Sequence, residues 1–211
     1  MNCLRILILA ALASAMAFAQ VSLDNAFQVR YASNLNIGDS VVNITNTGAR
    51  GGVGLQSGTA ASIGGSICAN VYTFSPDEQM ISCCSCPVTP NGLVSLSAKS
   101  DLISNTLTPA VPTSIVIKIL ATVPVGGSCT NSAAAVAAAT LAPGLASWGT
   151  TLHAGPTALP LFGTETAFTP ATLSASELAR LNDLCNFILA NGSGFGVCRS
   201  CRLGGLGAIS Q

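Results

Sequence analysis

Cysteines are the residues in this chain whose type and spacing could do the most chemistry. The sequence holds nine cysteines among 211 residues, and eight of them lie between residues 68 and 201. An even set of cysteines in an exported chain predicts a framework of disulfides. The residues expected to form four bridges are Cys68, Cys83, Cys84, Cys86, Cys129, Cys185, Cys198 and Cys201.

The spacing of the cysteines limits their pairing without choosing one pattern. Cys83 and Cys84 are neighbours, and a bridge between neighbours strains the peptide between them, so we expect them to take different partners. Cys185 is expected to tie its segment either to the first half of the chain or to the segment that contains Cys198 and Cys201.

Two other chemistries remain open for these cysteines. The pairs Cys83-x-x-Cys86 and Cys198-x-x-Cys201 together have the ligand count of a structural zinc site. The Cys198-x-x-Cys201 motif also has the spacing of a redox-active pair, and the neighbouring Arg199 and Arg202 would lower a thiol pKa. Export favours structural disulfides over both, because exposed thiols oxidise outside the cell.

Groups for acid–base catalysis are scarce. His153 is the only histidine, so a Ser-His-Asp triad would have to include it. Asp77 and Glu78 form the one adjacent acidic pair, which reads more simply as the start of a helix after Ser75 and Pro76. We therefore expect no catalytic residue, no metal site and no cofactor, and a hydrolase is the least favoured function.

The first half of the chain is expected to position the cysteines with β-strands. Apolar and polar residues alternate in several short runs separated by turn residues such as Asn91-Gly92, which is typical of a β-sandwich. Residues 115–120 are apolar on both faces except for Lys118, which predicts a central strand. Residues 50–65 are rich in glycine and are expected to form a loop. The other expected strands cover residues 27–31, 42–45, 69–74 and 94–97.

The second half has a different pattern. Leu178, Leu181, Cys185, Ile188 and Leu189 recur at helical spacing, and the Asn191-Gly192 pair that follows predicts the end of an amphipathic helix. At its start, Ser174 and Glu177 match a capping box. A short alanine-rich helix is expected within residues 132–141. Residues 148–170 are expected to be loop with at most one strand, and Trp148 is expected in the core unless it lines a pocket with His153.

The amino-terminal residues predict export. Arg5 precedes an uncharged apolar run, and Ala17-Phe18-Ala19 fits a signal-peptidase site. The apolar run is shorter than the roughly 20 residues of a membrane-spanning helix. We expect a signal peptide at residues 1–19, which would remove Cys3, and one secreted domain at 20–211. Its β-rich part would be 20–128, and the part with the helix and the later cysteines 129–211, with no transmembrane segment.

Charge is unusually sparse. Only 8% of the residues are charged, against about 25% in ordinary globular proteins. Without Arg5, the eight Lys and Arg residues become seven, against eight Asp and Glu residues. Such a chain has no basic patch for nucleic acid. Its near-neutral surface lacks the charge repulsion that keeps molecules apart.

Two stretches resemble a group of uncharacterised, secreted, cysteine-rich bacterial proteins. They are CANVYTFSPDEQ followed by CCSCP, from Cys68 to Pro87, and CRSCRLGG, from Cys198 to Gly205. The resemblance implies export and disulfides, but no activity.

The whole pattern predicts a mainly β, sandwich-like, disulfide-stapled fold with one C-terminal amphipathic α-helix. The expected role is structural, adhesive or self-assembling, at the cell surface or outside the cell. The alternative is a secreted module that binds a small molecule, a glycan or a metal.

Overall fold

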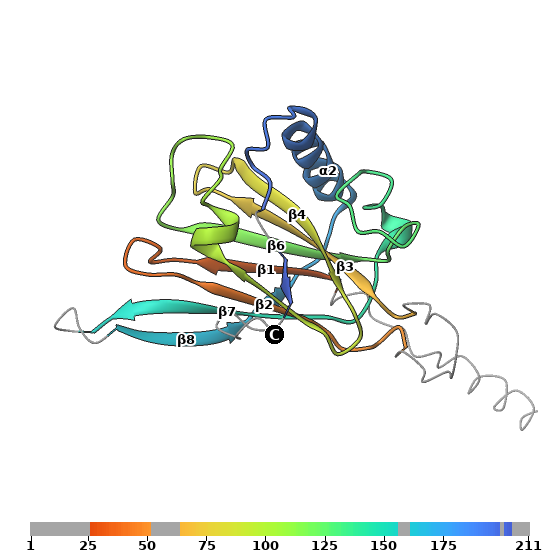
Figure 1. The fold of residues 1–211 in the computed structure, drawn as a ribbon, viewed down its shortest axis with the longest axis horizontal. Coiled ribbons are helices and arrows are strands. Elements are labelled where there is room, and N and C mark those ends of the chain that lie inside the picture. Colours follow the sequence, from red (N-terminus) through yellow and green to blue (C-terminus); the bar gives the residue numbers. More distant parts are fainter. Residues whose placement is uncertain (1–25, 52–63, 156–160, 199–200, 204–211) are drawn as a thin grey trace, which may run out of the picture.

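The computed structural model describes residues 26–51, 64–155, 161–198 and 201–203, which form two antiparallel sheets and one α-helix (Figure 1). The predicted mainly β fold with one C-terminal helix is confirmed. None of the helices within the described residues is long and apolar enough to cross a membrane. The elements are β1 (Phe27–Ala32), β2 (Val41–Asn46), β3 (Ile67–Phe74), β4 (Met80–Val88), β5 (Leu93–Ser97), β6 (Ile115–Thr122), β7 (Leu145–Ala154), β8 (Leu161–Ala167), β9 (Thr169–Pro170), α2 (Ala175–Ala190) and β10 (Arg202–Leu203), with a π-helical turn at Ala98–Leu102 and a 3₁₀ turn at Ala138–Thr140.

The two sheets have five strands each. The first sheet has the order β4-β3-β6-β1-β9, and the second has the order β10-β5-β2-β7-β8. Strand β6 lies in the middle of the first sheet, between β3 and β1, as its apolar sequence predicts. The turn at Asn91-Gly92 does not close a hairpin within one sheet, because it joins β4 of the first sheet to β5 of the second.

The main core lies between the two sheets. Val42 and Ile44 of β2 face Ile117 and Ile119 of β6 across this layer, and all four side chains are buried. Each of these side chains contributes about 1.5–3 kcal/mol through burial. The alternation that predicted the half-buried strand at residues 42–45 therefore reflects its packing.

Helix α2 covers the outer face of the first sheet and makes a third layer (Figure 1). Tyr72 of β3 and Leu120 of β6 pack in a second apolar cluster with Leu181 and Ile188 of the helix. The predicted apolar stripe of α2 is confirmed at Leu181, Cys185 and Ile188, whereas Leu189 is exposed.

The start of α2 differs in one detail from a capping box. The Ser174 hydroxyl accepts a hydrogen bond from the Glu177 N–H at 3.1 Å, as predicted. The Glu177 carboxylate instead lies 2.6 Å from the Nζ of Lys118. Lys118, the one charged residue of the central strand, is held by the helix that covers it and also lies over the ring of Phe74.

Three expectations for local structure are wrong. Residues 75–78 do not begin a helix but form the turn between β3 and β4, where Glu78 has a φ of 67°. Residues 132–141 form turns and the 3₁₀ element instead of an α-helix. Residues 148–170 are not mainly loop, because most of β7 and all of β8 and β9 lie there. Threonine-rich strands with exposed faces lack the apolar alternation on which the prediction rested.

Candidate functional site

Strand β4 organises the disulfides because successive side chains of a strand point to opposite faces. Cys83 faces α2 and pairs with Cys185, whereas Cys84 and Cys86 face the other way. The neighbours Cys83 and Cys84 thus take different partners, as predicted. The four bridges are Cys68–Cys129, Cys83–Cys185, Cys84–Cys198 and Cys86–Cys201, and such a framework indicates an oxidising environment.

The segment that carries Cys198 and Cys201 closes one edge of the sandwich. The Cys83 N–H donates to the Gly196 carbonyl at 2.8 Å, and Val197 forms a parallel bridge with Cys83. After Cys201 the chain crosses to the second sheet, where β10 pairs with β5. The segment therefore covers the free edge of β4 and ties the two sheets together.

The four cysteines considered from the sequence as zinc ligands do not come together. Cys83 lies on the other face of the sheet from Cys86 and forms its disulfide with Cys185 of α2. The sulfur atoms that do gather are those of Cys84, Cys86 and Cys201, which lie within 4.8 Å of one another in two neighbouring bridges. Cys198 and Cys201 do not share a bridge, unlike the two cysteines of a redox-active motif. An open groove of about 430 Å³ is lined by five cysteines, with at least one from each of the four bridges: Cys83, Cys84, Cys129, Cys198 and Cys201.

Trp148 and His153 do not form a pocket together, because they lie on opposite faces of β7 by strand alternation. Trp148 is 39% exposed instead of lying in the core. The His153 ring stacks on Phe162 and lies 2.9 Å from the Thr164 hydroxyl. These contacts place His153 in the β7–β8 hairpin without a carboxylate in contact among the described residues.

Beside this hairpin, Arg30 points inward from β1 to the second sheet. Its guanidinium donates to the hydroxyl and carbonyl of Thr166 and, at 2.9 Å, to the Thr151 hydroxyl. Burial lowers the pKa of Arg30, and Glu165 partly opposes the shift. Gly149 leaves room for this side chain, because a Cβ there would lie 2.4 Å from the Arg30 Nε.

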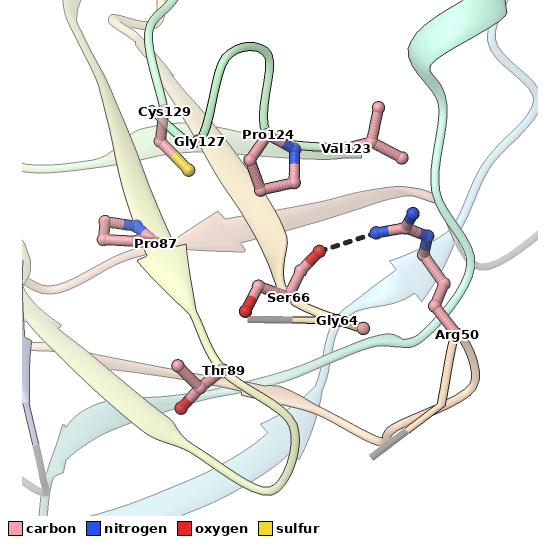
Figure 2. A pocket seen from close by; sticks show the side chains of 10 residues that line it. Arg50, Gly64, Ser66, Pro87, Thr89, Val123, Pro124, Gly127 and Cys129 are labelled. Atoms are coloured by element: carbon pink, nitrogen blue, oxygen red, sulfur yellow. Dashed lines mark hydrogen bonds between the residues drawn. The ribbon is translucent and has the colours of Figure 1, made fainter. Parts of the chain in front are cut away.

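A cavity of about 410 Å³ opens where β3 begins and β4 ends (Figure 2). Figure 2 shows Arg50 reaching toward Ser66, with Pro124 and Cys129 across the opening. The Arg50 guanidinium donates to the Ser66 carbonyl at 2.7 Å. Pro87 and Val123 add apolar wall.

Two residues position the walls of this cavity. The buried amide of Asn46 donates to the carbonyls of Gly65 and Val88 at 2.9 and 3.0 Å, which joins the ends of β2, β3 and β4. Gly65 has a φ of 88°, and a Cβ there would lie 1.9 Å from the Gly51 carbonyl oxygen. Sequence analysis missed this site, because its walls come from distant segments and are mostly proline, glycine and valine.

Comparison with known proteins gives no match: no family model, no curated protein and no solved structure is similar to this chain.

Proposed function

We propose that the protein is an exported structural protein that acts by self-association rather than by catalysis, and that a second copy of the chain adds to the edge of β8. Support comes from the exposure of this strand. All seven residues of β8 are exposed, and among the described residues the strand is the last one of its sheet. Edge strands of this kind present backbone groups that can pair with another chain.

The pairing of β8 with β7 determines which backbone groups face outward. The Phe168 N–H donates to the Ser147 carbonyl, and hydrogen-bonded residues alternate along an antiparallel pair. Thr164 and Thr166 therefore direct their N–H and C=O groups toward β7. Gly163 and Glu165 direct theirs toward the open edge, where a second strand would bind.

A second β8 strand fits this edge in an antiparallel register centred on Thr164. In that register Glu165 of each copy lies opposite Gly163 of the other, so the two carboxylates do not face each other and glycine leaves room for the larger side chain. Leu161 lies opposite Ala167. The strand carries none of the lysine or proline residues that commonly protect edges from pairing.

The test is sedimentation velocity of the mature, oxidised protein over a wide concentration range. The wild type is expected to form dimers or larger assemblies as concentration rises. Gly163→Pro removes an outward N–H without touching the bonds to β7, so it should keep the protein monomeric.

Gly163→Ala is the matched control, because it removes the glycine but keeps the N–H, and its Cβ would lie 3.7 Å from Leu152, an ordinary contact. It should assemble like the wild type. A monomeric wild type at the highest concentration, or equal assembly of the proline and alanine variants, would contradict this use of β8.

A further inference from the structure

From the cavity beside Arg50 we infer a second property that does not depend on self-association: the protein binds a small carboxylate with a compact apolar body. The volume of about 410 Å³ lies within the range of about 300–1,000 Å³ that is usual for small-molecule sites. The site is small, mostly apolar and equipped with one fixed cation, and these three properties define the ligand class.

Arg50 supplies the charge. Among the described residues, the salt bridges join Lys118 and Arg180 to Glu177, and none of them includes Arg50. One guanidinium nitrogen is held by the Ser66 carbonyl, which orients the group at the rim of the cavity. A guanidinium has five N–H donors in a planar fork, so donors remain for a carboxylate, which such a fork binds through both oxygens.

Ser66 supplies the carbonyl that orients Arg50. Its residue is 5% exposed, and its hydroxyl oxygen is buried without a hydrogen-bond partner among the described residues. This hydroxyl is inaccessible from the cavity and points away from Arg50 (Figure 2), so Ser66 acts through its carbonyl, which fixes the position of the guanidinium.

The remaining walls select the body of the ligand. Pro87, Val123 and Pro124 present apolar surface. The Cys68–Cys129 bridge fixes the wall that carries Cys129 to the start of β3. The described lining contains no aromatic ring on which a sugar could stack, so an apolar carboxylate suits the cavity better than a glycan.

The experiment is isothermal titration calorimetry of the oxidised mature protein with benzoate and hexanoate, compared with the uncharged benzamide and hexanamide. At least one acid is expected to bind saturably, and more tightly than its amide. Arg50→Gln should weaken that binding about tenfold or more, because it removes the charged fork.

Lys99→Gln is the matched control, because it removes an exposed cation outside the cavity, and it should leave binding unchanged. Intact mass with four bridges and an unchanged circular dichroism spectrum show that each variant is folded.

Saturable binding of neither acid, equal binding of acid and amide, or equal binding by Arg50→Gln would overturn the inference. Repeating the titration with the Gly163→Pro variant separates this result from the proposed self-association. If the monomeric variant still binds the acid, the result supports the site. If it has lost binding, the inference that acid binding does not depend on self-association is overturned.

Discussion

Tyr72 shows how a single buried hydroxyl makes stability depend on pH. The side chain of Tyr72 is fully buried between the first sheet and α2, and its hydroxyl has no hydrogen-bond partner among the described residues. Burial disfavours the phenolate and raises the pKa of Tyr72 well above its usual value. The folded protein therefore holds this proton more tightly than the unfolded chain does.

This difference predicts the direction of the pH effect. Below about pH 10, where the unfolded tyrosine is also protonated, Tyr72 gives no pH dependence. Above that pH the unfolded chain loses the proton first, so the free energy of unfolding should fall by up to about 1.4 kcal/mol per pH unit. Tyr72→Phe should remove this part of the decline, as measured by urea unfolding at about pH 8 and pH 11.

The exposed Tyr31 provides the control. The free energy of unfolding of Tyr31→Phe should fall with pH as much as that of the wild type. Equal slopes for Tyr72→Phe and the wild type would show that the buried hydroxyl does not ionise differently on unfolding.

Individual residues were predictable where their role is local. The Ser174 cap and the helix end at Asn191-Gly192 follow from nearest-neighbour chemistry, and both are present. The role of Arg50 depends on chain segments far away in the sequence, because its partner Ser66 and the apolar walls meet only in the folded protein. No residue type or spacing near Arg50 indicated a cavity.

At the scale of elements, β4 carries three of the four bridges, and this concentration predicts an unexpected order of stabilities. Cys84–Cys198 and Cys86–Cys201 span 114 and 115 residues and lie side by side, so each closes a loop that the other has already closed. Cys68–Cys129 spans only 61 residues, but no other bridge joins residues close to both of its ends.

A bridge stabilises the protein by restricting the unfolded chain, so the shorter bridge, Cys68–Cys129, is expected to contribute more to the free energy of unfolding. Cys68→Ser with Cys129→Ser should lower the free energy of unfolding by about 4 kcal/mol, and Cys84→Ser with Cys198→Ser by about 2 kcal/mol. Urea unfolding of the two double variants measures both losses. If the losses instead followed sequence separation, with Cys84–Cys198 the larger, the bridges would act independently.

Strands were predictable where one face of the strand, or both faces, carry apolar residues. Residues 42–45 and 115–120 meet that condition and form β2 and β6. Strand β4 was missed because its sequence is mostly cysteine and serine, and the pattern at Ser75-Pro76 indicated a helix. In β1 the strand was predicted, yet its polar residues Gln28 and Arg30 face the core, where they donate hydrogen bonds to residues of β7 and β8. The Nε of Arg30 has no hydrogen-bond partner among the described residues. Polar residues inside a sandwich cannot be placed without knowing the opposite sheet.

At the scale of the whole molecule, the four disulfides indicate an extracellular or otherwise oxidising environment. The amino-terminal residues 1–19, on which the prediction of export depends, lie outside the described residues, as does most of the expected loop at residues 50–65. The four bridges support an oxidising destination independently of that segment.

Intact mass spectrometry of the exported protein tests both parts together. We expect a chain that begins at Gln20 and gains the mass of eight hydrogen atoms on full reduction, two for each of the four bridges. Retention of residues 1–19 would contradict the signal peptide. A smaller gain would show that some of the eight cysteines are not paired.

The pairing of the β4 cysteines also determines when the native disulfides can form. The partners of Cys83, Cys84 and Cys86 are the last three cysteines of the chain. A chain that leaves the cell amino end first exposes these three thiols together with Cys68, long before their partners emerge, so the earliest available pairings are non-native. Such pairs are corrected only through mixed disulfides with another thiol. We therefore predict that a disulfide isomerase raises the yield of native bridges above the yield with an oxidant alone, because an oxidant does not reverse the early pairs.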